Sequence, residues 1–141
     1  MSWQLILSFS HSLILSFSKI MNRVTHFEIP SDNPETSRKF YSDTFGWTFQ
    51  KFGDFDYWLI NTGPDDQPGI HGGLTKKNHP GQPVTNSIEV PDLSAAIQAV
   101  EKNGGTIVVQ KMPIPGVGWL AFFKDPDQNI FGIMQTDTAA K

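Results

Sequence analysis

HFEIPSDNPETSRKFYSDTFGW, residues His26–Trp47, is the stretch that decides the fold, together with a second stretch of the same design. Alternating apolar and polar residues over 24–30 predict a strand. The NPE sequence at 33–35 is typical of a helix start, and Gly46 is typical of a helix end. NSIEVPDLSAAIQAVEKNGGTIVV, at 86–109, repeats this order about sixty residues later. A strand and a helix that occur twice in the same order indicate two similar modules.

The second helix is predicted from one apolar stripe with the spacing i, i+3, i+4, i+7, formed by Leu93, Ala96, Ile97 and Val100. Strand-like segments follow each helix, at 47–52, 56–61 and 69–76 in the first half and at 106–111, 118–123 and 129–135 in the second. The breaker cluster NHPGQP at 78–83 separates the halves, and the polar tail 136–141 is expected to fray. These patterns predict an α+β fold of two βαβββ modules, 22–77 and 84–136, which form a shared cleft.

The amino-acid composition limits the kinds of binding partner that can be expected. The formal net charge is −3 and the isoelectric point is near 5.7, so neither nucleic acid nor an anionic membrane is an expected partner. The chain has no cysteine, which excludes disulfides and thiolate metal sites and fits a cytoplasmic protein. Aromatic residues reach 12%, enough to line an apolar pocket for a small-molecule ligand. Open, curved sheets leave edges that a symmetric partner can cover, so we expect a homodimer.

The first twenty residues differ from the rest. LILSFS occurs at Leu5–Ser10 and again at Leu13–Ser18, and no basic residue precedes Lys19. Serines interrupt the apolar run, so it resembles neither a secretory signal nor a membrane span. We therefore expect residues 1–20 to be a low-complexity extension or a mis-called start, followed by one domain over 21–141.

Several motifs agree in order with a known family. HFEIPSDNPETSRKFYSDTFGW, EKNGGTIVVQ at 101–110 and GVGWLAFFKDPDQNIFGIMQ at 116–135 resemble the vicinal oxygen chelate superfamily of glyoxalase- and bleomycin resistance-like proteins. The closest likeness is to small glyoxalase-like proteins of unassigned activity. The resemblance implies the two-module fold and a site in the cleft, while the superfamily includes lyases, dioxygenases, transferases and binding proteins.

The resemblance also implies where a divalent metal would be held, by side chains of the first and last strand of each module. Matched residue by residue, these positions fall on His26, on about Gly73, on Asn86 or Ser87, and on Gly132. Glycine has no ligating side chain, so only His26 is a good ligand type. We therefore expect the usual metal to be missing and no other cofactor to be held. An unorthodox divalent site built from His26, Glu28, His71 and Glu89 is the alternative.

Strand alternation selects the candidate site residues. Phe27 and Ile29 should face a helix, which turns His26 and Glu28 to the cleft, and the same reasoning turns Ser87 and Glu89 inward. Counting from Gly73 places His71 on the inward face as well. Two carboxylates that approach one another raise one pKa, so Glu28 and Glu89 could do acid/base work. The alternative is that each carboxylate is satisfied by nearby donors, or that the two never meet.

Apolar residues for the pocket wall are Trp58, Trp119 and Met134, although core packing is the commoner role for such residues. Gln128 stands in a turn where relatives often carry glycine, so the turn type is expected to differ.

Three functions remain open at this point. The first is metal-independent binding of a small molecule in the cleft. The second is a lyase or isomerase acting on a carbonyl compound through Glu28, Glu89 and His26, with or without a divalent metal. The third is that the pocket is vestigial and the two modules serve dimerisation.

Overall fold

The structure is a computed structural model that describes residues 22–141 of the chain. The predictions for residues 1–20 fall outside the described residues. Within 22–141, neither helix is both long enough and apolar enough to cross a bilayer.

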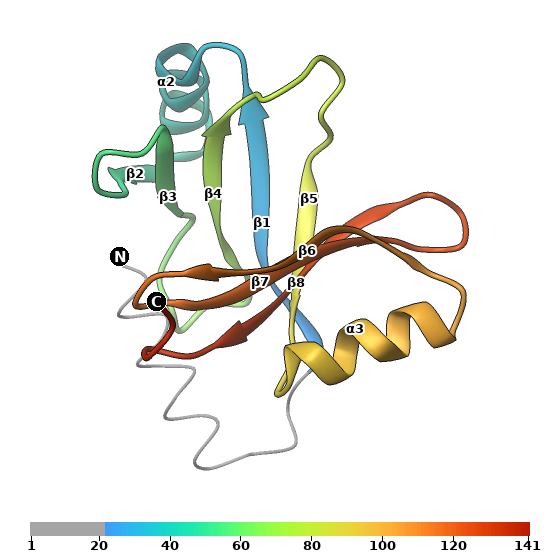
Figure 1. Cartoon of the computed structure of the whole chain (residues 1–141). Coiled ribbons are helices and arrows are strands. Elements are labelled where there is room, and N and C mark those ends of the chain that lie inside the picture. Colours follow the sequence, from blue (N-terminus) through green and yellow to red (C-terminus); the bar gives the residue numbers. More distant parts are fainter. Residues whose placement is uncertain (1–21) are drawn as a thin grey trace. The chain divides into compact units, whose positions relative to one another are not determined.

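The described residues form two βαβββ modules in succession (Figure 1). Module one comprises β1 Arg23–Ser31, α2 Pro34–Phe45, β2 Thr48–Lys51, β3 Tyr57–Asn61 and β4 His71–Lys76. Module two comprises β5 Thr85–Glu89, α3 Leu93–Lys102, β6 Thr106–Ile114, β7 Gly118–Lys124 and β8 Ile130–Thr136. The α+β class, the order of the elements and the repeat are therefore confirmed.

The chain divides into two compact units that follow the modules closely. One unit contains 26–85, and the other contains the start of β1 up to Thr25 together with 86–141. The Asn22 amide donates to the Glu89 carbonyl within the second unit. The cleft shared by the two modules stays a prediction.

In module one the strands lie in the order β2, β3, β4, β1. β1 and β4 run parallel with His26 opposite His71 and Glu28 opposite Gly73, while β3 is antiparallel to β4. Helix α2 covers one face of this sheet, where the Arg38 guanidinium lies 4.6 Å from the Trp58 ring centre. Asn33 accepts the Thr36 amide at the start of α2, and Gly46 ends it with a φ of 73°, as predicted.

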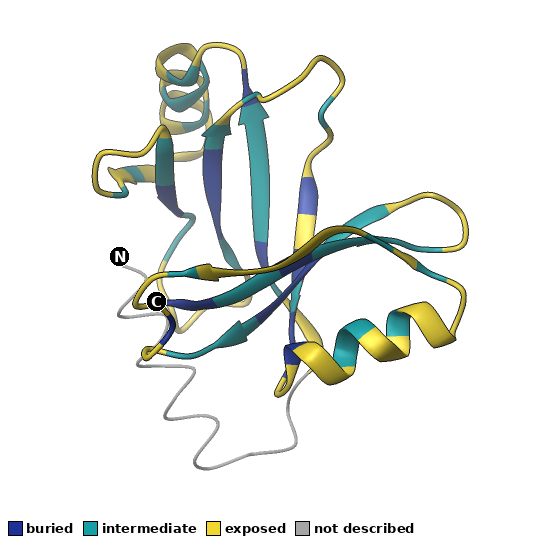
Figure 2. Cartoon of the chain, viewed as in Figure 1, coloured by how far each residue is buried: buried dark blue, intermediate teal, exposed yellow. Residues whose placement is uncertain are grey.

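In module two the order is β5, β8, β7, β6, with β5 parallel to β8. Leu93 at the start of α3 is fully buried, and it joins Val90, Ala121 and Ile133 in the core cluster. The predicted fraying of the tail is wrong in part, because Ala140 is buried and its carbonyl accepts the Gly116 amide. Helix α2 has no buried residue, and Figure 2 shows it coloured only as exposed or intermediate.

Candidate functional site

β1 places His26 and Glu28 on one face of module one and Phe27 on the other. Phe27 faces the helix side, where its ring contacts Trp47. Because side chains alternate along a strand, His26 and Glu28 occupy the face away from α2. His26 is 6% exposed and Glu28 is half-buried. The predicted alternation of this strand is confirmed.

Tyr57 completes this cluster from β3, which is separated from β1 by β4. Its hydroxyl lies 2.9 Å from His26 Nε2 and is also hydrogen-bonded to the Glu28 carboxylate. A phenol has one proton to donate, and when it is given to Glu28 the Nε2 nitrogen of His26 must carry the hydrogen that meets Tyr57. The result is a chain of hydrogen bonds from His26 through Tyr57 to Glu28, which we call the polar relay.

Burial changes the acidity of every group in the polar relay. Loss of solvation, followed by the nearby His71, lowers the pKa of His26 to about 4, so its imidazole is neutral at physiological pH. Desolvation raises the pKa of Glu28, and the Tyr57 hydrogen bond only partly offsets this. The pKa of Tyr57 is raised by burial and then by the Glu28 charge. The polar relay thus joins a neutral imidazole, a neutral phenol and a carboxyl that takes up a proton more readily than usual.

Gly73 is what lets Tyr57 reach the polar relay. A Cβ atom built on Gly73 would lie 1.8 Å from the Tyr57 hydroxyl oxygen and 2.2 Å from its ring carbon Cζ. Both distances are far below van der Waals contact, so no other residue fits there while Tyr57 keeps this place. The phenol therefore takes the space above β4 that a side chain at position 73 would need.

The register of the strands corrects one part of the sequence matching. Ser87 pairs with Gly132 in module two, whereas His26 pairs with His71 in module one. By this count the counterpart of Gly132 is His71, and Gly73 lies two residues further along β4. Module one therefore has a histidine at the position where the sequence matching placed a glycine.

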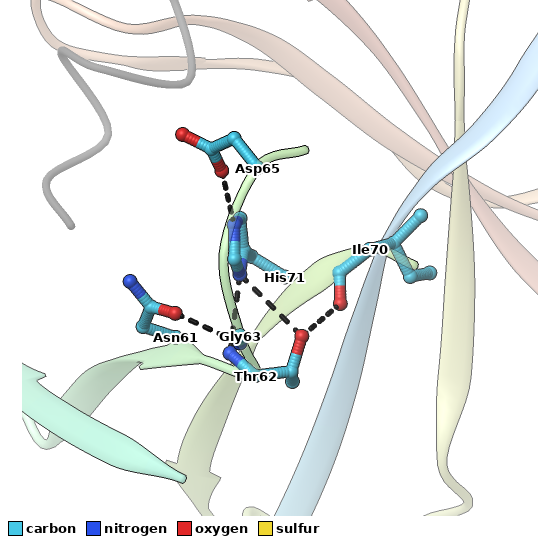
Figure 3. A network of polar contacts seen from close by, with 6 residues as sticks. All are labelled: Asn61, Thr62, Gly63, Asp65, Ile70 and His71. Carbon is cyan, nitrogen blue, oxygen red and sulfur yellow. Dashed lines mark hydrogen bonds and ion pairs between the residues drawn. The ribbon is translucent and has the colours of Figure 1, made fainter. Parts of the chain in front are cut away.

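Both ring nitrogens of His71 are already used, as Figure 3 shows. Nδ1 accepts the Thr62 amide at 3.1 Å, and Nε2 lies 2.9 Å from an Asp65 oxygen. Since Nδ1 is an acceptor, Nε2 carries the proton and donates a hydrogen bond to Asp65. The Thr62 hydroxyl donates to the Ile70 carbonyl, so it is not activated as a nucleophile by His71. In this network His71 closes the loop 62–70 and offers no lone pair to a metal.

In module two, Ser87 and Glu89 are buried on one face, as alternation predicted, and Asn86 is exposed. The Glu89 carboxylate accepts the Thr136 hydroxyl at 2.6 Å. Ser87 Oγ lies 2.4 Å from where a Gly132 Cβ would be. Glu89 is thus satisfied by a hydroxyl of its own module, and its meeting with Glu28 stays a prediction.

The predicted apolar wall needs correction. Met134 pairs with Glu89 and is buried on the same face, but Trp58 and Trp119 are not on the predicted faces. Trp58 lies under Arg38 of α2, and Trp119 packs against the core cluster beneath α3 and donates to Asp137 at 3.1 Å. Both tryptophans therefore belong to the helix sides of their sheets, because they alternate with the residues of the opposite face.

The residues do not fit the metal site of the resembled family. Among residues 22–141 no group of three or more His, Asp and Glu side chains could hold a metal ion. His71 is engaged, Ser87 and Gly132 provide no strong ligand, and Tyr57 fills the space above Gly73.

Sequence reasoning missed Tyr57. It stands in DYWLIN, a strand that was correctly predicted, and it lies 31 residues from His26 in the sequence. Alternation places Tyr57 and Leu59 on one face of this strand and Trp58 and Ile60 on the other. Trp58 and Ile60 are the more apolar pair, so they would have been the better choice for the face covered by the helix. This difference in hydrophobicity between the two faces could have replaced Trp58 by Tyr57 among the predicted site residues.

Comparisons with known proteins give a consistent result. A family model described as "Bleomycin resistance protein-like N-terminal" matches residues 23–63, which is most of module one. A "Glyoxylase-like domain-containing protein" of Didymella fabae is 34% identical over 117 residues, covering 79% of this chain and 91% of the relative.

Solved structures share the fold at low identity. A glyoxalase/bleomycin resistance protein/dioxygenase superfamily member from Vibrio splendidus has a TM-score of 0.58 at 17% identity, covering 80% of this chain and 97% of that one. Methylmalonyl-CoA epimerase from Mycobacterium tuberculosis has a TM-score of 0.63 at 12% identity, covering 84% and 90%. Identities this low establish the fold and leave the activity open.

Proposed function

This chain belongs to the vicinal oxygen chelate superfamily of glyoxalase-like and bleomycin resistance-like proteins, and we propose that it binds a small molecule without the usual metal. The ligand would meet the face of module one that carries Glu28, Tyr57 and His26. The observation that carries this proposal is the polar relay itself.

A half-buried carboxyl is expensive to keep in a folded protein unless it has partners. Burial disfavours the charged form of Glu28, and one hydrogen bond from Tyr57 only partly offsets the cost. A ligand that donates a hydrogen bond to Glu28 would supply the missing partner. Functional sites are where such uncompensated groups gather, which supports a binding role for this cluster.

The place of Tyr57 supports metal independence. A metal would need ligands from β4, but Gly73 has none, its space is filled by the phenol, and His71 is bound to Thr62 and Asp65. The polar relay offers a hydroxyl, an imidazole and a carboxyl in place of a cation. Its chemistry is that of hydrogen bonding and proton transfer.

The binding proposal can be tested by a thermal-shift screen against a library of small metabolites. A compound that raises the melting temperature of the native protein should lose most of its effect in Glu28→Gln and Tyr57→Phe. Glu35→Gln, an exposed change on α2, is the matched control and should behave as wild type. Full retention of binding in both relay variants would contradict the proposal.

Two additions to the same screen test the remaining predictions. Glu89→Gln should weaken the same ligand only if Glu89 takes part in its site. Zn²⁺, Ni²⁺ or Mn²⁺ should leave the melting temperature and the ligand affinity unchanged, and a chelator should do the same. One equivalent of metal in protein purified without chelator would contradict metal independence.

The second candidate function is an isomerase, and the raised pKa of Glu28 favours it. A carboxylate with a raised pKa is a better general base near neutral pH. Glu28 would take a proton from the carbon next to a carbonyl, and because one carboxylate reaches only one face of that carbon, inversion would require a second acid to return a proton to the other face. The reaction is balanced within one substrate, so no oxidant or co-reactant is required.

Isomerase activity is tested by exchange of that proton with solvent deuterium. Methylmalonyl-CoA is a suitable first compound, because a structural neighbour is named for its epimerisation. Incorporation of deuterium at the acidic carbon should depend on Glu28 and persist after chelation. Exchange that is equally fast in Glu28→Gln would remove this candidate.

We also propose a homodimer. β6 is an edge strand of module two, and it exposes Val108, Val109 and Met112. An uncovered edge with apolar residues is a surface that a second copy can pair with. Light scattering should give twice the chain mass, and a monomer at high micromolar concentration would contradict the proposal.

A further inference from the structure

A run of aromatic side chains leads to the polar relay. Phe52 follows β2 directly, and its amide donates to the Tyr57 carbonyl at 2.9 Å, so Phe52 and Tyr57 are neighbours across the hairpin. Their ring centres lie 6.4 Å apart in an edge-to-face arrangement. Phe55, in the turn of the same hairpin, stacks on Phe52 with ring centres 6.1 Å apart. These three rings form what we call the aromatic run.

The aromatic run has one exposed end and one polar end. Phe55, at one end, is 67% exposed. Tyr57, at the other end, is half-buried and holds its hydroxyl between His26 and Glu28. Residues opposite each other on antiparallel strands project to the same face, so Phe52 and Tyr57 share the face of the polar relay.

We infer that the ligand of this site is a planar aromatic molecule that carries an O–H or N–H donor. The inference rests on the proposed function and names its ligand class. The ring of the ligand would pack against Phe52 and Tyr57, with Phe55 closing over its exposed side, and the donor would meet the Glu28 carboxyl. The two requirements come from different residues, so they can be tested separately.

The aromatic ring of the ligand is inferred from the neighbouring rings, and its donor group is inferred from the hydrogen bonds that Glu28 can still accept. Aromatic rings prefer edge-to-face or offset contacts at centre distances of about 4.5–7 Å, so the ring of a ligand would meet Phe52 and Tyr57 in one of these arrangements. Glu28 accepts hydrogen bonds, and Tyr57 provides only one. A ligand without a donor would cover the Glu28 carboxyl and leave it short of a hydrogen-bond partner, which would weaken binding.

Two matched pairs of probes test the ligand class by isothermal titration calorimetry with the full chain. 2-Naphthol and indole carry a donor, while 2-methoxynaphthalene and N-methylindole keep the ring and lack it. We expect each donor probe to bind at least about tenfold more tightly than its methylated partner, as one buried hydrogen bond can account for. Glu28→Gln should reduce this difference for both pairs.

The aromatic half is tested by Phe55→Ala with Phe45→Ala as the control. Phe45 is exposed to a similar extent, 62%, but it belongs to α2 on the other side of the sheet. Phe55→Ala should weaken the donor probes about tenfold and Phe45→Ala should leave them unchanged. Equal binding of the methylated probes, no effect of Phe55→Ala, or no binding of either donor probe at about 1 mM would each overturn the ligand class.

Failure of this inference differs from failure of the proposed function. If a non-aromatic compound binds and depends on Glu28 and Tyr57, the binding function stands and the aromatic class falls. If aromatic probes bind equally well to wild type, Glu28→Gln and Tyr57→Phe, the relay is not the binding site and both fall. Circular dichroism of each variant confirms that it is folded.

Discussion

The two modules share one order of elements but have placed different chemistry on corresponding strands. Module one carries His26 and Glu28 on β1, and module two carries Ser87 and Glu89 on β5. Glu89 is paired with Thr136, whereas Glu28 is joined through Tyr57 to a buried imidazole. The difference shows that two modules with the same order of elements can treat corresponding carboxylates differently, one with a single hydroxyl partner and the other within a group of titratable side chains.

The two helices differ in how many residues they bury. α3 buries Leu93 completely and anchors the core cluster of module two. α2 buries no residue, and it leaves Phe40 and Phe45 more than half exposed. Module two should therefore contribute more to stability, and module one more to binding.

Leu93→Ala should lower the free energy of unfolding by about 3.5 kcal/mol, because it removes a fully buried side chain and leaves a cavity. The Leu93 amide keeps its bond to Gln135, since that bond is made by the backbone. Phe40→Ala on α2 should cost less than about 1 kcal/mol, because that ring is 55% exposed. Urea unfolding of both variants measures the contrast. Equal losses would show that the helices do not differ as described.

His26 should make the protein sensitive to acid. Its pKa is lowered from 6.5 to about 4, so the unfolded chain takes up this proton more readily than the folded protein. The stabilisation is therefore complete above pH 6.5 and is lost as pH falls from there through about 4. At a pH of about 4.5 the loss should reach about 2.5 kcal/mol.

Glu28 acts in the opposite direction in part of this range. Because its folded pKa is raised, stability increases as pH falls through that pKa toward the value of the unfolded chain. Urea unfolding at about pH 7.5 and about pH 4.5 should therefore be compared in wild type, His26→Gln and Glu28→Gln. His26→Gln should lose less stability between the two conditions than wild type, and Glu28→Gln should lose more. Parallel curves for all three proteins would contradict the assignment.

The sequence allowed the fold to be predicted more fully than the site, for a physical reason. Alternation and capping are local, so the strand of His26 and Glu28 and the helix bounded by Asn33 and Gly46 could be read directly. The partner of His26 depends on the register of β1, β4 and β3, which is set by tertiary pairing. Alternation within β3 could have placed Tyr57 rather than Trp58 on the face of His26, but the hydrogen bond between Tyr57 and His26 could not be read from the sequence.

Gly73→Ala and Gly132→Ala compare the modules at their small residues. A methyl group at 73 would collide with Tyr57, so the phenol must leave the polar relay, at a cost of about 2 kcal/mol. At 132 the nearest atom is Ser87 Oγ, a hydroxyl that can rotate away, although Phe122 at 3.3 Å leaves little room. The cost there should be about 1 kcal/mol.

Only the change at 73 should also abolish ligand binding, because it alone displaces Tyr57 from the polar relay. Urea unfolding combined with the thermal-shift assay separates the two effects. If Gly132→Ala weakens ligand binding as much as Gly73→Ala does, module two takes part in the site and the division between the modules fails.

The smallest expected effect concerns the turn between β7 and β8, where module two keeps a demanding backbone without the usual glycine. Gln128 has a φ of 71°, a left-handed conformation that costs a residue with a Cβ atom. The expectation of a different turn type is therefore not supported at this residue, since its φ lies in the region that favours glycine.

The turn is held by its neighbours. Asp125 accepts the amides of Asp127 and Asn129 and the side-chain amide of Asn129. Gln128→Gly should relieve the strain, and the greater freedom of glycine in the unfolded chain should offset part of the gain, which leaves an increase of about 0.5 kcal/mol. Gln128→Ala keeps the Cβ atom and should give no increase. A loss of stability in Gln128→Gly would mean that the glutamine side chain contributes to the turn more than its backbone strain costs.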